Sequence, residues 1–118
     1  MGRDPRAFLW DVRAAADKIT AFVQGKSADE FVRDELTSSA VERQLEIIGE
    51  ALGQLAKADP AIAARIPDLS QIVALRNILI HGYVIVKRDL VWRTIHDDLP
   101  RLREVVDGLL ASSGPPQQ

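Results

Sequence analysis

The sequence contains no cysteine, one methionine and few aromatic residues: one tyrosine, two tryptophans and three phenylalanines among 118 residues. Without cysteine the chain cannot form disulfides, thiolate metal sites or a cysteine nucleophile, which fits a reducing compartment. The sequence also lacks any uncharged apolar run near the roughly 20 residues that span a bilayer, and its start lacks the apolar core of a signal peptide. We therefore expect a cytoplasmic protein.

An excess of positive charge is missing as well, because 15 Lys and Arg stand against 17 Asp and Glu, a formal net charge of −2. Proteins that bind nucleic acid over much of their surface gain most of their affinity from Lys and Arg that neutralise phosphates. Any RNA-binding site in this chain must therefore depend on a local basic patch. Arg76, Lys87 and Arg88 are the candidates for that patch. Length and an apolar content of 47% suit one globular domain. We expect residues 1–111 to form it and residues 112–118 to be a flexible tail.

Two helix starts in the first third are marked by capping residues. Asp4 followed by Pro5 provides an N-cap and a first-turn proline, so a helix is expected to about residue 23, stopped near Gly25. Ser27 with Glu30 three residues later has the form of a capping box, which predicts a short helix to about residue 34. Apolar spacing then predicts a long helix from residue 37 or 38 to about residue 58.

The second half of the chain predicts two further helices. One begins near residue 68 and carries the most apolar stretch of the sequence. Residues 84–86 are β-branched and could continue the helix or extend. We favour a break here because Lys87, Arg88 and Asp89 are polar, followed by a last helix with Asp89 as its N-cap and a kink at Pro100. The predicted fold class is all-α, an up-and-down bundle of four to five main helices with short extra helices.

Two glycines and two glutamates recur at helical spacing on the long helix. Because glycine destabilises a helix relative to alanine, we expect another helix to approach closely at Gly49 and Gly53. Glu46 and Glu50 lie one turn apart beside them. They form either a solvated face or a source of carboxylate for Arg76 or for a helix of a second copy.

Arg76 interrupts the apolar run of the central helix. At about 100° per residue it lies in the middle of a stripe of apolar side chains, namely Leu69, Ile72, Val73, Leu79 and Ile80. Burying an unpaired guanidinium is costly. Arg76 therefore needs either a carboxylate partner, as in a buried Arg–Glu pair between helices, or an opening to solvent and ligand.

His81 lies about 140° around the same helix from Arg76, on the side that it shares with Asn77. A straight helix therefore does not bring the guanidinium and the imidazole onto one face. The Arg side chain could wrap around, the helix could unwind at Gly82, or two copies of the chain could complete one site. Histidine is suited to proton transfer near neutral pH, although a structural role for His81, and for the ring of Tyr83, is the alternative.

These residues form an Arg-x4-His-x-Tyr motif, with Asn directly after the Arg, that resembles the signature of the HEPN ribonuclease superfamily. It is most similar to the HepT-like toxins of HEPN/MNT (type VII) toxin–antitoxin systems. Residues 41–51 and residues 90–95, followed by Asp98-Leu99-Pro100, resemble two further helices of that family. The resemblance covers about residues 4–111 and implies a HEPN-like helical bundle.

The resemblance implies a metal-independent endoribonuclease without a cofactor of its own. His81 would be the general acid or base, Arg76 would hold the phosphate, and Asn77 would orient His81 or the RNA backbone. We add Glu46 and Glu50 as supporting residues. The family also implies a homodimer with a composite cleft between its subunits.

A partner is implied as well, a minimal nucleotidyltransferase antitoxin that uses ATP to transfer AMP to the hydroxyl of Tyr83 and so silences the toxin. The alternative function is a non-catalytic helical module that binds a nucleotidyltransferase. A di-metal bundle is disfavoured because neither His81 nor His96, which we expect at the surface, follows a Glu by three residues. A helix-turn-helix DNA binder would need a basic recognition helix, and the best candidate here is apolar nearly all round.

Overall fold

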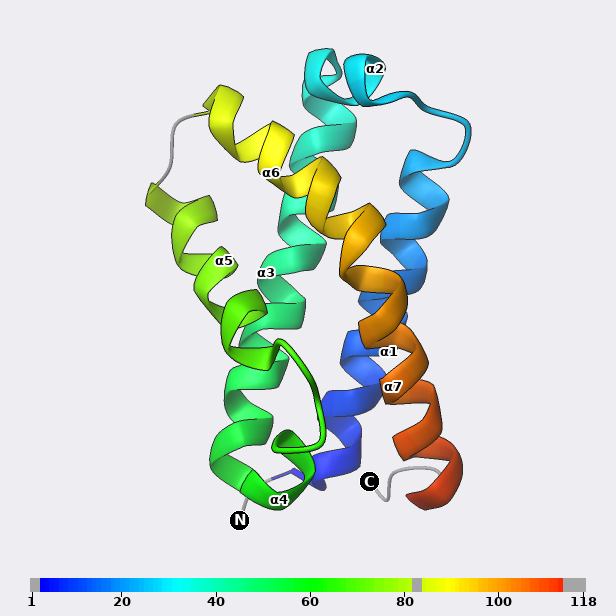
Figure 1. The fold of residues 1–118 in the computed structure, drawn as a ribbon, viewed down its shortest axis with the longest axis vertical. Helices are drawn as coiled ribbons and strands as arrows, with labels where there is room; N and C mark the ends of the chain where they lie inside the picture. Colours follow the sequence, from blue (N-terminus) through cyan, green and yellow to red (C-terminus); the bar gives the residue numbers. More distant parts are fainter. Residues whose placement is uncertain (1–2, 82–83, 114–118) are drawn as a thin grey trace.

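The computed structural model describes the backbone of residues 3–81 and 84–113, and the side chains of those residues except 84–86 and 113. Within this part of the chain every regular element is a helix, which confirms the predicted all-α class. Five main helices and two short ones occur. They are α1 (Pro5–Val23), α2 (Ala28–Arg33), α3 (Glu35–Ala58), α4 (Pro60–Ala63), α5 (Leu69–His81), α6 (Val84–Asp97) and α7 (Leu99–Ser113) (Figure 1).

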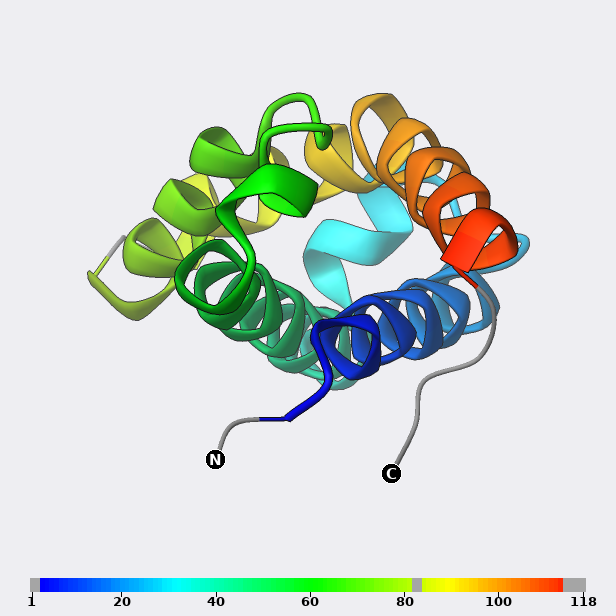
Figure 2. The ribbon, with the colours of Figure 1, turned by 90° about the horizontal axis from the view of Figure 1, so that it is seen from below.

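The long helix α3 organises the bundle, with α1 packed along one side and α5 along the other (Figure 2). Helix α7 packs against α1, while α6 packs against α2 and leads into α7. Helix α5 makes its main packing contact with α3 alone. It is therefore an outer helix, despite being the most apolar one in the sequence.

The core is formed by apolar side chains that recur at helical spacing along the main helices. Large side chains from several elements are fully buried, and they are Leu9, Val12, Ile19, Phe31, Val41, Ile48, Leu52, Leu55, Val91 and Val106. Removing such side chains from water is the main stabilising contribution to a domain of this size. Phe22, near the end of α1, is an exception among the large apolar side chains of that helix because it is 38% exposed.

The predicted helix starts in the first third have the expected caps. The Asp4 carboxylate accepts from the backbone N–H of Arg6 at 3.0 Å. The capping box between Ser27 and Glu30 is complete, with both reciprocal bonds present. Gly25 has a φ of +78°, in the left-handed region that favours glycine, and lies just beyond α1. These local signals therefore fix the first two helices.

Helix α3 begins at Glu35, two to three residues earlier than predicted, because Asp34 caps it. The Asp34 carboxylate accepts from the backbone N–H of Thr37 at 3.0 Å and from its hydroxyl at 2.7 Å. These hydrogen bonds, with a further one from Lys26, lower the pKa of Asp34 to about 2. Ser38 follows inside the helix and is fully buried.

The prediction of a loop at Lys87 with Asp89 as an N-cap is wrong, because α6 already begins at Val84. Lys87 lies inside the helix and donates from Nζ to the backbone carbonyl of Leu79 on α5 at 3.0 Å. Arg88 donates to the carbonyl of Val32 at 2.8 Å. Polar residues that the sequence suggested as a linker are thus used to join α6 to neighbouring helices.

The prediction of one last helix with a kink is also wrong, because two helices occur there: α6 ends at Asp97 and α7 begins at Leu99. Pro100 is the second residue of α7, where a missing N–H costs no intrahelical bond. The chain changes direction at this break (Figure 1). Helix α7 continues to Ser113, two residues past the predicted end of the domain at 111. No helix within residues 3–81 or 84–113 has the length and hydropathy needed to cross a bilayer.

Candidate active-site groove

A groove of about 590 Å³ lies over α3, between the start of α1 and the second half of α5. Its charged lining consists of three arginines, each paired with a carboxylate that also lines the groove. The pairs are Arg3 with Asp11 at 2.7 Å, Arg43 with Glu46 at 3.5 Å and Arg76 with Glu50 at 3.6 Å. The groove is therefore charge-balanced when empty, and an anion entering it competes with carboxylates for the guanidinium groups.

Arg76 lies at the edge of the buried surface of α5, not in its middle. The side of α5 that is buried carries Ile72, Leu75 and Leu79, whereas Ile80 is 49% exposed. The Arg76 side chain is 38% exposed and that of Glu50 is 57% exposed. Arg76 is therefore open to solvent and also has a carboxylate beside it, but the two side chains do not form a buried pair.

The prediction that Glu50 offers its carboxylate to Arg76 is confirmed by their ion pair. Exposed pairs of this kind contribute roughly 0–1 kcal/mol because solvent screens both charges. Glu46 instead faces Arg43, although it lines the same groove. The Arg76 guanidinium is thus oriented but weakly held, which leaves it able to bind an oxyanion.

Close helix approach is confirmed at one of the two predicted glycines. A Cβ atom built on Gly49 would lie 3.0 Å from the Cβ of Arg76. At Gly53 a Cβ would meet nothing within 4 Å, so the prediction for that residue is wrong. The contact between α3 and α5 is therefore tightest at the residue that carries the guanidinium.

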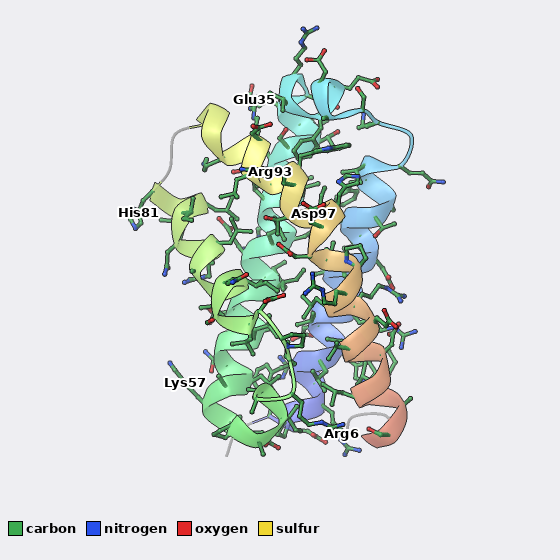
Figure 3. All side chains as sticks on the ribbon, viewed as in Figure 1. Arg6, Glu35, Lys57, His81, Arg93 and Asp97 are labelled. Atoms are coloured by element: carbon green, nitrogen blue, oxygen red, sulfur yellow. The ribbon has the colours of Figure 1, made fainter. Side chains whose placement is uncertain are left out.

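His81 is the last residue of α5 and is exposed, as is Asn77 one turn earlier. Figure 3 shows His81 at the outer edge of the molecule. Helix α5 is regular up to His81, so it does not unwind before that residue, and His81 is not among the residues that line the groove. Within one chain the structure therefore does not bring His81 to Arg76. Gly82 and Tyr83 lie outside the described residues.

A second hollow of about 260 Å³ adjoins the groove and shares Arg43 and Glu46 with it. Lys87 lines this hollow, and its ammonium group pairs with Glu42 at 3.3 Å while it donates to the Leu79 carbonyl. Leu79 is two residues before His81. Lys87 therefore anchors the end of α5 that carries the imidazole, and its predicted contact with RNA stays a prediction, as does that of Arg88.

Sequence reasoning gave no role to several residues of the groove. Arg43 and Gln54 share a face of α3 with Glu46 and Glu50, and this spacing of three to four residues was the available signal. Arg3 reaches the groove from outside the first helix, which spacing does not predict. Among the described residues no three His, Cys, Asp or Glu side chains form a group suited to a metal ion.

An aromatic cluster on α6 was also missed. The Trp92 ring lies 5.3 Å from that of Phe31 and 4.0 Å from that of His96. His96 is exposed, as predicted, and its Nδ1 lies 2.9 Å from the carbonyl oxygen of Trp92. These contacts join α2 to α6 and give His96 local partners away from the groove.

Comparison with known proteins gives one family and several full-length relatives. The family described as ribonuclease HepT-like matches residues 12–109. A candidate RNase of Methanocaldococcus jannaschii is 33% identical over 107 residues, 89% of this chain and 95% of its own. A candidate RNase of Caldanaerobacter subterraneus subsp. tengcongensis is 32% identical over 108 residues, 92% of this chain and 96% of its own. A protein of Thermococcus cleftensis named a probable ribonuclease HepT is 32% identical over 103 residues, 87% of this chain and 93% of its own. No solved structure matches the chain.

Proposed function

Because this chain belongs to the HepT-like ribonuclease family, we propose that it is a metal-independent endoribonuclease, the toxin of a HEPN/MNT toxin–antitoxin pair. One observation carries the proposal beyond the family. Arg76 lines a groove, its side chain is 38% exposed, and its guanidinium has only a weak carboxylate partner. A cation in that state can bind a phosphate and stabilise the charge that develops on it.

The proposed reaction uses the ribose 2′-hydroxyl of the RNA as its nucleophile. The 2′-oxygen forms a bond to the adjacent phosphorus while the bond from phosphorus to the 5′-oxygen breaks. A base takes the proton of the 2′-hydroxyl, and an acid gives a proton to the departing 5′-oxygen. The products are a 2′,3′-cyclic phosphate and a 5′-hydroxyl. His81 serves as one proton-transfer group and Arg76 stabilises the phosphoryl oxygens, with Asn77 beside the imidazole.

We further propose that two copies complete the site. One chain offers Arg76 in the groove and His81 outside it, so a second chain is needed to bring an imidazole and a guanidinium to the same phosphate. Ile80 of α5 supports pairing along this helix, because it is 49% exposed and lines the groove beside Arg76. A second copy packed over the groove would cover this apolar side chain.

The antitoxin in this proposal is a minimal nucleotidyltransferase that places AMP on Tyr83, two residues after His81. The transfer joins the α-phosphorus of ATP to the phenolic oxygen and releases pyrophosphate. An added anionic nucleotide next to the motif would compete with RNA for Arg76. The proposal for Tyr83 rests on the family motif alone.

The test is cleavage of an end-labelled single-stranded RNA of about 20 nucleotides by the purified chain. We expect His81→Ala and Arg76→Ala each to lower the cleavage rate by about 100-fold or more, because each removes a group that acts on the reacting phosphate. His96→Ala is the matched control, since His96 is also an exposed helical histidine. Cleavage by His81→Ala at the wild-type rate would refute the proposal. Unfolding of both site variants would support the non-catalytic module instead.

A further inference from the structure

Gly49 is a buried residue in the middle of α3, where a glycine is otherwise unfavourable. A Cβ built on it would lie 3.0 Å from the Cβ of Arg76, 3.2 Å from its Cδ and 3.5 Å from its Cγ. The first two distances are shorter than carbon atoms in contact normally allow. The missing side chain at position 49 is therefore what allows the aliphatic part of Arg76 to lie against α3.

This contact determines where the guanidinium emerges. With its Cβ, Cγ and Cδ held against the helix at Gly49, the Arg76 side chain ends beside Glu50, the next residue of α3. The ion pair with Glu50 is long and exposed, and a pair of this kind restrains a side chain weakly. The packing of the Arg76 side chain against Gly49 therefore restricts the position of the guanidinium more than the ion pair with Glu50 does.

We propose that Gly49 is a positioning residue that seats Arg76 and so places its guanidinium in the groove. The inference rests on the proposed ribonuclease function for its catalytic consequence, while the packing of Arg76 against Gly49 is a property of the fold. An alanine at 49 would require Arg76 to move outward by a few tenths of an ångström. A displacement of about 1 Å can lower the rate of an enzyme about 100-fold.

Gly53 provides a matched control one turn further along α3. A Cβ built there meets nothing within 4 Å, so alanine fits without displacing a neighbour. Both substitutions improve the helix propensity of α3 by a similar amount. A difference between Gly49→Ala and Gly53→Ala therefore reports the contact with Arg76 and not the loss of a glycine from the helix.

The first experiment measures kcat and KM for cleavage of the same single-stranded RNA. We expect Gly49→Ala to lower kcat/KM about 10- to 100-fold, mostly through kcat, because Arg76 stabilises charge that develops in the transition state. Gly53→Ala should stay within about twofold of wild type. In the Arg76→Ala background, Gly49→Ala should cause no further loss. Equal activities of the two glycine variants, or an added loss in that background, would overturn the inference.

A second experiment needs no activity and uses thermal unfolding of the full chain in a double-mutant cycle. Gly49→Ala should lower Tm clearly in wild type and much less in Arg76→Gly, because glycine removes the Cβ, Cγ and Cδ contacts together. If Gly49→Ala fails to fold in wild type, folding in the Arg76→Gly background identifies Arg76 as the colliding group. Equal effects in both backgrounds, or failure to fold in both, would mean that Arg76 is not what Gly49 accommodates.

The two experiments separate this inference from the proposed function. If wild type does not cleave RNA, or if His81→Ala and Arg76→Ala cleave normally, the ribonuclease proposal fails. The unfolding cycle still tests whether Gly49 accommodates Arg76. If wild type cleaves RNA while both site variants do not, Gly49→Ala can still behave like Gly53→Ala in both experiments. In that case the ribonuclease proposal stands and the positioning role of Gly49 is refuted.

Discussion

Replacing Lys87 by methionine tests how α6 holds the end of α5 that carries His81. The Lys87 ammonium donates to the Leu79 carbonyl at 3.0 Å and pairs with Glu42 at 3.3 Å. The two charged side chains are only 18% and 17% exposed. Methionine keeps the length and the apolar stem of lysine but removes both interactions.

The expected loss of stability follows from these two contacts. A hydrogen bond from a charged donor contributes about 1.5–3 kcal/mol, and a carboxylate that loses a mostly buried cation adds a desolvation cost. We expect Lys87→Met to lower the free energy of unfolding by about 2–3 kcal/mol. For a chain of this size that corresponds to a fall in Tm of about 10 °C.

Thermal unfolding followed by circular dichroism measures this change, with Lys57→Met as the control. Lys57 is exposed in the last turn of α3 (Figure 3), and its removal should cost no more than about 0.5 kcal/mol. A double-mutant cycle with Glu42→Gln should give a coupling of about 1 kcal/mol or more. If Lys87→Met melts like Lys57→Met but binds RNA more weakly, Lys87 contacts RNA and is not the anchor of α5.

Three further substitutions test other parts of the account. Ser38→Ala should lower stability by about 1–2 kcal/mol in urea unfolding, because its buried hydroxyl lies 2.7 and 2.8 Å from two backbone carbonyls, while exposed Ser39→Ala should not. The pKa of Asp34 is lowered to about 2, so its charge stabilises the fold above about pH 4 and this stabilisation is lost as the pH falls toward 2. The stability difference between wild type and Asp34→Asn should therefore close over that range, and a constant difference would contradict the cap. Ile80→Lys should shift a homodimer toward monomer in light scattering, and an unchanged mass would exclude pairing along the face of α5 that carries Ile80.

Much of the fold is predictable because its signals are local. Asp4, Ser27 and Glu30 cap helices within three residues of themselves, and apolar spacing identifies the buried sides of the long helices. The errors fall where distant contacts decide the outcome. Lys87 and Arg88 read as a polar linker in the sequence, and they are helical because their partners lie on α5, α3 and α2.

The candidate site is predictable in its members more than in its geometry. Helix angles correctly separated Arg76 from His81, and the spacing of glycines correctly indicated the close contact at Gly49. The degree of exposure of Arg76 did not follow from its apolar neighbours, because α5 packs mainly on one helix and leaves Ile80 in solvent. Periodicity identifies a stripe, whereas tertiary packing decides how much of that stripe is covered.

The claim that Arg76 and His81 act on the same phosphate is tested most directly by single-turnover RNA cleavage with wild type, Arg76→Ala, His81→Ala and the double variant. Groups that act together in one transition state have non-additive effects, so we expect the double variant to be about as slow as the slower single variant. A double variant whose loss equals the product of the two single losses would show that the two residues act independently. Wild-type rates in either single variant would contradict the account altogether.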